Sequence, residues 1–159
     1  VWNYLPKIDR TIRVPSSMMM ASWMGSHFTN DDLVKESRLV RDYVIKRTFD
    51  GPRNNRREME FSLTPTADAA VVWGRIDFVV DKDALLPVAA RYYDEVGELK
   101  RTMTYDQVKT FGDRRIPARM TMIPADKPEE STVIVYSDLA FDVAVPDATF
   151  SLQRLRRQR

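Results

Sequence analysis

Apolar and polar residues alternate along most of this chain, and this period of two constrains the fold more than any other feature. In the segment 57–63, Met59, Phe61 and Leu63 fall on one face, and charged or small polar residues fall on the other. Such alternation predicts β-strands with one apolar and one polar face. Strands are expected on this basis at residues 1–5, 10–14, 42–49, 57–63, 74–81, 88–94, 98–106, 114–122 and 131–137.

Short polar links separate the expected strands. Residues 94–98 and 111–115 each contain a glycine and predict tight hairpin turns. Closely spaced strands with such turns form an antiparallel meander rather than a parallel α/β sheet. The run 131–137 is apolar on both faces, so it is expected in the middle of the sheet. Longer links are expected at 50–56, 81–87 and 124–131, with a looser loop at 63–70.

The segment 16–33 breaks the alternation and holds four of the eight methionines. Pro15 followed by two serines predicts a helix start, with Ser16 or Ser17 as the N-cap. Gly25 is expected to end this helix as a left-handed residue. The spacing predicts one apolar helix face formed by Met20, Trp23 and Met24. A second short helix is expected at 31–35, with Thr29 or Asn30 as its cap. The carboxylates of Asp31 and Asp32 would stabilise the positive end of its dipole.

The tail of the chain predicts one more helical turn. Asp147 is expected to cap it, and the turn is expected to bury Phe150, with Leu155 as a further candidate. Residues 154–159 are basic. They are expected to form a solvated tail, and binding to phosphate groups or nucleic acid is the less favoured alternative.

The expected helices are too short to cover one face of such a sheet. Either another part of a longer protein covers that face, or it forms a pocket for an apolar ligand. Methionine is flexible and tolerates ligands of varied shape, which suits a pocket, although the methionine-rich segment taken by itself is better explained as a helix that fills the core. The expected cavity lining is Met59, Phe61, Ile76, Phe78, Leu99, Met103, Tyr105 and Met120, and the expected lid is Met19, Met20, Trp23, Met24 and Phe28.

The composition argues against several classes of function. The chain has 159 residues, a net charge of only +2 and no cysteine. We therefore expect no nucleic-acid partner and no thiolate chemistry. No apolar run approaches the length of about 18 residues that a transmembrane helix needs. The five glycines form no phosphate-binding loop, so no cofactor is expected.

The candidate catalytic and metal-binding residues are better explained in other ways. His27 with Asp31 and Asp32 matches no known set of metal ligands, so a polar contact or a solvated loop is favoured for His27. Glu58 and Glu60 are expected on a solvated strand face, where no pKa shift would suit them to acid–base catalysis. With no nucleophile, base or metal site to nominate, we expect a protein that is not an enzyme.

Three stretches of the sequence carry a family resemblance. Residues 92–105 contain a tyrosine-bearing strand and a glycine turn, and residues 146–155 contain a closing P-D-x-x-F motif. The most specific stretch is 2–33, where the matching residues are Trp2, Tyr4, Leu5, Pro6, Arg10, Arg13, Ser16, Trp23, Met24, Gly25, Ser26, Phe28, Thr29, Asp32 and Leu33. On these residues the chain resembles the bacterial outer-membrane lipoprotein-sorting proteins, which are similar to the periplasmic lipoprotein carrier LolA. His27 departs from the pattern, which has an acidic residue there.

The resemblance implies a mainly β (α+β) fold, in which a strongly curved antiparallel sheet forms an incomplete β-barrel with short helices plugging its open side. Residues 1–159 would be a single domain of this kind, without the N-terminal helix and first strands of the family. The implied function is a periplasmic carrier that binds lipoprotein acyl chains or lipids and ferries them toward the outer membrane. The alternative is an accessory subunit of an inner-membrane exporter of hydrophobic molecules, which would dock through an edge strand or the lid.

In such carriers a buried arginine can hold the lid shut through hydrogen bonds to backbone carbonyls. The sequence offers Arg10, Arg13, Arg38 and Arg41 near the expected lid. No motif assigns the role to any of them.

Overall fold

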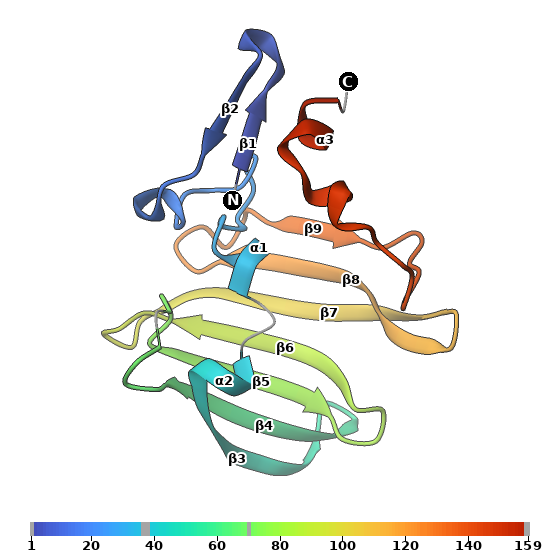
Figure 1. Cartoon of the computed structure of the whole chain (residues 1–159). Helices are drawn as coiled ribbons and strands as arrows, with labels where there is room; N and C mark the ends of the chain where they lie inside the picture. Colours follow the sequence, from blue (N-terminus) through green and yellow to red (C-terminus); the bar gives the residue numbers. More distant parts are fainter. Residues whose placement is uncertain (1, 36–38, 70, 158–159) are drawn as a thin grey trace.

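The computed structural model describes residues 2–35, 39–69 and 71–157. Its main body is one antiparallel sheet of seven strands, in the order β3-β4-β5-β6-β7-β8-β9 (Figure 1). Each strand pairs with its neighbour in the sequence, which confirms the expected antiparallel meander. The strands are β3 (Tyr43–Arg53), β4 (Arg56–Pro65), β5 (Arg75–Asp81), β6 (Leu86–Tyr93), β7 (Leu99–Phe111), β8 (Arg114–Pro124) and β9 (Thr132–Val135).

The sheet is curved but not closed, which confirms the expected incomplete barrel. Strands β3 and β9 lie at opposite edges and do not pair with each other. Register shifts leave one extra residue each in β3 (Thr48), β6 (Val88) and β7 (Lys100). An extra residue at such a position bends the strand and increases its twist, so these bulges help to curve the sheet around one face.

A separate hairpin of β1 (Trp2–Leu5) and β2 (Arg10–Arg13) precedes the sheet, with the 3₁₀ turn η1 (Pro6–Ile8) between its strands. Figure 1 shows this hairpin projecting away from the seven-stranded sheet, beside the C-terminal helix α3 (Leu152–Arg157). The two are in contact, since the Arg156 Nε–H donates to Thr11 Oγ1 at 3.1 Å.

The predicted hairpin turns after Tyr93 and Phe111 are confirmed, and one predicted link is shorter than expected. Residues 50–53 continue strand β3, so the expected link at 50–56 is wrong over most of its length. Only Asn54 and Asn55 form the turn, both with left-handed φ angles of 53° and 58°. Asparagine tolerates this conformation, which suits a two-residue hairpin. Pro52 is accommodated because β3 is an edge strand.

One face of the sheet carries most of the core, and we call it the inner face; Ile76, Phe78 and Met103 point from it. Alternate residues of β4 to β8 project from the same face, as the period of two requires. The main cluster of buried residues is Phe28, Tyr43, Leu63, Ile76, Ala90, Met103 and Met122. Phe28 comes from outside the sheet, so this core joins the inner face to the segment that precedes β3.

The outer face is less solvated than the sequence suggests. Glu58 is only 1% exposed, and Glu60 accepts hydrogen bonds from Arg53 at 2.5 Å and Arg91 at 2.9 Å. Burial would raise the pKa of the Glu60 carboxyl, but these two guanidinium groups hold the pKa below its usual value. The expectation of a solvated strand face is therefore wrong here, because long arginine side chains from neighbouring strands cover the glutamates.

Strand β9 is an edge strand, so the expectation that 131–137 lies mid-sheet is wrong. Val133 and Val135 are exposed on the outer face, and Ile134 packs against the core from the inner face. An apolar residue on each face is typical of a buried strand, but the same pattern also fits an edge strand that leaves one apolar face exposed.

The expected helix over residues 17–24 does not form. Only a 3₁₀ turn, η2 (Ser16–Met18), is present, and the chain then runs through turns and bends. Polar side chains bind the backbone instead: the Asn30 amide donates to the Met18 and Ala21 carbonyls at 3.1 and 3.3 Å, and Ser26 Oγ donates to the Trp23 carbonyl at 2.6 Å. Such bonds compete with helix formation. Gly25 is left-handed as expected (φ 74°) but ends no helix.

The short helix α1 (Asp32–Lys35) forms where it was expected, with Thr29 as its cap. Thr29 Oγ1 accepts from the Asp32 N–H at 3.3 Å, and Asp32 Oδ2 accepts from the Thr29 N–H at 2.7 Å. This reciprocal pair is a capping box with aspartate in the third position. A further helix, α2 (Leu39–Asp42), leads into β3. We call residues 16–42 the cover segment, of which 36–38 lie outside the described residues.

The tail departs from its prediction. The 3₁₀ turn η4 (Asp147–Phe150) has Pro146 at its N-cap and no side-chain capping bond, so Asp147 does not cap it. Phe150 is 81% exposed rather than buried, because the tail lies outside the described core. Leu155 is half-buried. Ser151 Oγ accepts from the Arg154 N–H at 3.2 Å and so caps helix α3.

Candidate functional site

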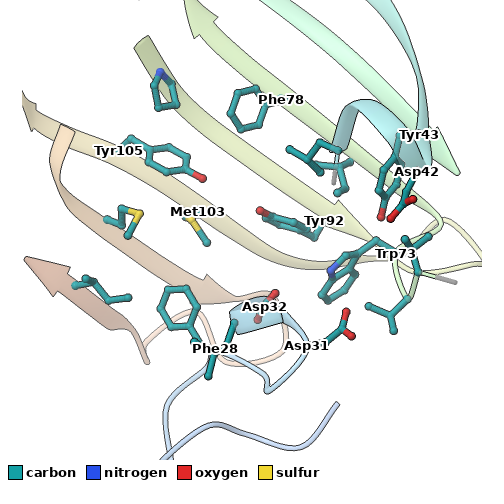
Figure 2. Close-up of a pocket in the computed structure, with 18 of the residues that line it drawn as sticks. Phe28, Asp31, Asp32, Asp42, Tyr43, Trp73, Phe78, Tyr92, Met103 and Tyr105 are labelled. Atoms are coloured by element: carbon teal, nitrogen blue, oxygen red, sulfur yellow. The ribbon is translucent and has the colours of Figure 1, made fainter. Parts of the chain in front are cut away.

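A cavity of about 440 Å³ lies between the inner face of the sheet and the cover segment (Figure 2). This volume is within the range of about 300 to 1,000 Å³ that is usual for small-molecule sites. The sheet contributes most of the wall, and the cover segment and the loop between β4 and β5 contribute the rest. The lining residues are Trp23, Phe28, Asp31, Asp32, Leu33, Leu39, Asp42, Tyr43, Val71, Val72, Trp73, Ile76, Phe78, Pro87, Tyr92, Met103, Tyr105, Met120, Ile134 and Tyr136.

Seven of the residues predicted for the site line this cavity. Strands β5, β7 and β8 place their residues there because alternate side chains point to the inner face. Trp23 and Phe28 reach the cavity from a tight loop of the cover segment, in which the Trp23 N–H donates to the Phe28 carbonyl at 2.7 Å. The five predicted sheet residues in the lining are Ile76, Phe78, Met103, Tyr105 and Met120.

Three predicted sheet residues lie outside the lining. Phe61 packs against the core cluster. Met59 pairs with Val80 and is half-buried, near the turn that joins β3 and β4. Leu99 is exposed at the start of β7 and pairs with Tyr93, because the register shift leaves Lys100 as an extra residue and turns Leu99 to the face opposite Arg101 and Met103. Alternation therefore gives the wrong face for Leu99, and for Met59 and Phe61 it does not predict how far along the strand the cavity extends.

The predicted lid methionines also lie outside the lining. Met24 is 85% exposed at a left-handed position, Met20 is exposed, and Met19 is half-buried. Their predicted common face required a helix, and the cover segment has none over these residues. A role for the three in binding a ligand stays a prediction.

A buried ion pair joins the cover segment to the sheet. Arg101 on β7 donates from its two terminal nitrogens to the two carboxylate oxygens of Asp32 at 2.5 and 2.7 Å. The guanidinium carbon also lies 4.4 Å from the ring centroids of both Trp73 and Tyr92. Burial would raise the pKa of the Asp32 carboxyl, but the hydrogen bonds and charge of Arg101, with further bonds from Thr29, hold the pKa below its usual value.

Of the four arginines suggested by position in the sequence, the three that the structure describes do not make this contact. Arg10, Arg13 and Arg41 are exposed, and Arg38 lies outside the described residues. Arg101 carries a signal that could have found it, because it falls on the same strand face as Met103 and Tyr105. An arginine among apolar residues on an inward face requires a buried partner.

A second polar contact ties the cover segment to the edge of the sheet. His27 lies within hydrogen-bond distance of Thr132 Oγ1 through Nδ1 (2.8 Å) and of Glu130 Oε2 through Nε2 (3.1 Å). The hydrogen bond from His27 and one from Lys127 hold the pKa of the Glu130 carboxyl below its usual value. The polar contact expected for His27 is therefore present, and it places the neighbouring Phe28 against the inner face.

Several lining residues escaped the sequence analysis. Trp73, Val71 and Val72 come from the irregular loop before β5, which has no periodicity to interpret. Tyr92 and Ile134 are inner-face residues of expected strands and could have been found by alternation. Trp73 and Tyr92 form a tilted ring pair with centroids 5.3 Å apart, and this pair stacks on Arg101.

The cavity has an acidic end. Asp31 is buried and Asp42 is half-buried, and both line the cavity. Figure 2 shows Asp42 beside Tyr43, and Asp31 on the other side of Trp73, toward Asp32. Burial raises the pKa of the Tyr43 hydroxyl to about 12, with smaller contributions from the neighbouring Tyr92, Asp31 and Asp42. The hydroxyl therefore stays neutral at physiological pH.

Among the described residues, no helix is both long and apolar enough to span a bilayer.

A family model described as an uncharacterized protein matches residues 1–157 of the chain. No curated protein matches it. Among solved structures, the chain is similar to a domain from Vibrio parahaemolyticus that is described as an outer-membrane lipoprotein-sorting protein, with 26% identity and a TM-score of 0.84. That alignment covers 98% of this chain and 65% of the Vibrio chain.

Two further solved structures have the same fold. A DUF1329 family protein from Desulfovibrio piger is 26% identical, with a TM-score of 0.83 over 97% of this chain and 63% of that one. A LolA superfamily protein from Nitrosomonas europaea is 22% identical, with a TM-score of 0.76 over 97% of this chain and 67% of that one. The chain thus spans just under two thirds of the length of the first two structures.

Proposed function

Because the chain belongs to the bacterial outer-membrane lipoprotein-sorting family and has the LolA-like fold, we propose that it is a periplasmic carrier of lipoprotein acyl chains or lipids. It holds the apolar part of its ligand between the inner face of the sheet and the cover segment, and it carries that ligand toward the outer membrane. In this role it binds and releases the ligand without changing it chemically.

The observation that carries this proposal is the cavity itself. Its wall is mostly aromatic and aliphatic, and only one end bears carboxylates. Each methylene group that an acyl chain moves from water into such a site contributes about 0.8 kcal/mol. A cavity of this lining therefore favours a hydrocarbon chain over a polar metabolite.

A carrier must also release its ligand, and the cover segment is suited to opening. The segment has little regular structure, and its contacts with the sheet include two polar ones, Arg101 with Asp32 and His27 with Thr132. A segment that few contacts hold can open at a lower cost than the continuous sheet can unfold. In the proposed function, entry and release of the acyl chain accompany the opening of the Arg101–Asp32 pair.

The test is binding of a fluorescent, uncharged acylglycerol by the wild-type protein and two matched tryptophan variants. Trp23→Ala removes a tryptophan ring that lines the cavity and is 36% exposed. Trp2→Ala is the control: it removes a ring on β1 that is 48% exposed and lies outside the cavity lining. Trp23→Ala is expected to weaken binding about tenfold with little change in melting temperature, because the ring contacts ligand more than core. Trp2→Ala should leave binding unchanged.

Loss of binding and of stability in equal measure for Trp23→Ala would leave only a core role for this residue. Absence of saturable binding by the wild-type protein would contradict the carrier function altogether.

One observation favours the alternative of an accessory subunit of an inner-membrane exporter. Edge strand β9 exposes Val133 and Val135, and an exposed apolar edge can pair with a strand of another protein. Co-purification with an exporter that is lost when Val133 is replaced by lysine would support this docking. Retention of the partner by that variant would contradict docking at β9.

A further inference from the structure

We propose that the end of the molecule that projects from the sheet docks on an anionic phospholipid bilayer. This projecting end comprises the β1–β2 hairpin and helix α3, residues 2–13 and 152–157, which lie beside each other in Figure 1 and are joined by the hydrogen bond from Arg156 to Thr11. None of its residues lines the cavity. The inference therefore goes beyond the proposed function, and it requires no ligand in the cavity.

The first argument is the uneven distribution of charge along the chain. The projecting end carries six basic residues and one acidic residue, whereas the rest of the sequence carries 19 basic and 22 acidic residues. The one acidic residue, Asp9, accepts a hydrogen bond from the Tyr4 hydroxyl at 2.8 Å. A chain with a net charge of only +2 thus concentrates positive charge at this end. The six basic residues, all exposed, are Lys7, Arg10, Arg13, Arg154, Arg156 and Arg157.

The second argument is the lack of ionic partners for these cations. Eight of the ten arginines on strands β3 to β8 form an ion pair with a carboxylate. In the described part of the chain, no carboxylate forms an ion pair with any of the six cations of the projecting end. Clustered like charges repel one another, so an anionic partner would stabilise this arrangement.

The third argument is the apolar side chains that accompany the cations. Ile8 at the tip of the hairpin is 60% exposed and follows Lys7. Ile12 is also exposed and lies on the same face of β2 as Arg10. Bilayer-binding surfaces combine apolar side chains, which enter the boundary between head groups and acyl chains, with lysines and arginines, which contact anionic head groups. Nucleic acid would engage the cations but leave the isoleucines in water, so the combination favours a bilayer.

A bilayer bound at this end would adjoin the cover segment. Strand β2 ends at Arg13, and the cover segment begins at residue 16. The side chains of Met18 and Met20, early in the cover segment, are exposed. Docking would therefore bring a bilayer close to the segment whose opening, in the proposed function, lets the acyl chain enter and leave.

The experiment is sedimentation of the wild-type protein, without acylglycerol, with two kinds of vesicle. One kind is pure phosphatidylcholine, and the other contains about one third phosphatidylglycerol, which gives it a negative surface. At about 0.1 M salt we expect at least about tenfold tighter binding to the anionic vesicles, and loss of that preference near 1 M salt, where charges are screened beyond about 3 Å. Equal binding to both kinds, or binding to neither, would overturn the proposal. Neither result bears on the carrier function, which the acylglycerol probe tests separately.

Two triple variants test which cations act. The first, Lys7→Gln with Arg154→Gln and Arg157→Gln, removes three exposed cations from the projecting end and leaves the Arg156 contact intact. The matched control removes three exposed cations from the sheet. Each basic residue near an anionic bilayer strengthens binding up to about fivefold, so the first variant should bind at least about tenfold more weakly. The control should bind nearly as wild type does, and an equal loss in both variants would overturn docking at the projecting end. The control substitutions are Lys46→Gln, Lys109→Gln and Arg115→Gln.

A final pair of variants tests whether the partner is a bilayer or another polyanion. Ile8→Ser is expected to weaken binding to anionic vesicles about threefold or more, because the tip loses its apolar anchor. Val96→Ser is the control, since it changes an 80% exposed valine in the turn between β6 and β7, and it should leave binding unchanged. Unchanged vesicle binding by Ile8→Ser, or tighter binding of the wild-type protein to a DNA duplex than to the vesicles, would overturn a bilayer as the partner.

Discussion

The seven-stranded sheet and the cover segment form opposite walls of one cavity, yet different interactions hold them. Each inner strand of the sheet has a hydrogen-bonded neighbour on both sides, and its inner face buries Ala90, Met103 and Met122 almost completely. The cover segment has two short helices, exposes most of its methionines, and is held to the sheet by Phe28 and a few polar bonds. This difference suggests that the sheet supplies the stability of the fold and the cover segment supplies access to the cavity.

The largest expected effect is in the sheet. Met122→Ala empties a fully buried position near the end of β8 and should lower the free energy of unfolding by about 2 to 5 kcal/mol. Met24→Ala is the matched change in the cover segment, where the side chain is almost fully exposed, and should stay within about 0.5 kcal/mol of wild type. Urea unfolding measures both. Comparable losses in the two variants would remove the distinction between the two walls.

The next largest effect is at the contact between the walls. Asp32→Asn leaves the buried Arg101 without its counter-charge and should cost about 3 kcal/mol of unfolding free energy. Asp83→Asn breaks an exposed ion pair with Arg57 and serves as the control, with an expected cost below about 1 kcal/mol. If Asp32→Asn cost no more than this control, the ion pair would not hold the cover segment.

The same pair predicts how acid acts on the protein. The pKa of Asp32 is lower in the folded state than in the unfolded state, so its carboxylate stabilises the fold above the unfolded value, about 4. That contribution is lost as the pH falls through the lower, folded pKa. The difference in unfolding free energy between wild type and Asp32→Asn should therefore shrink below about pH 4. A difference that stays constant into strong acid would show that charge is not the cause.

A smaller effect is expected at the cap of α1. Thr29→Ala removes the side chain that accepts from the Asp32 N–H, and caps of this kind contribute about 1 kcal/mol. Asp32 also binds Arg101, so loss of the cap should weaken the contact that holds the cover segment on the sheet. We therefore expect Thr29→Ala to raise the dissociation rate of the acylglycerol probe, while the free energy of unfolding changes little. Stopped-flow dissociation tests this, with Thr48→Ala as a threonine control on edge strand β3. Identical release rates in the two variants would argue against coupling between the cap and the ion pair.

The strands of the sheet could be predicted from the sequence, whereas the conformation of the cover segment could not. Strand positions and the inner-face residues Ile76, Phe78, Met103, Tyr105 and Met120 followed from alternation, because a strand fixes the direction of every second side chain. The cover segment has no such period. Its conformation depends on hydrogen bonds such as those of Asn30 and Ser26, which compete with a helix that composition alone favours.

Only one partner of the Arg101–Asp32 ion pair could have been predicted from the sequence. The position of Arg101 on an apolar strand face could have been recognised by alternation. Its partner Asp32, 69 residues earlier in the chain, could not, because only the folded structure brings the cover segment over β7. Trp73 could not be predicted as a lining residue either, because it lies in an irregular loop and only the folded path of that loop brings it to the cavity.

The most direct test of the central claim is to find where an acyl chain binds. The protein would be loaded with an acylglycerol that carries a photoreactive diazirine near the end of its chain, irradiated, digested and mapped by mass spectrometry. Labels are expected on inner-face peptides of β5, β7 and β8, including Phe78, Met103 and Met120, and excess unlabelled acylglycerol should prevent them. Labels confined to the β1–β2 hairpin or the outer face, or labelling that does not saturate, would contradict a cavity that holds an acyl chain between the sheet and the cover segment.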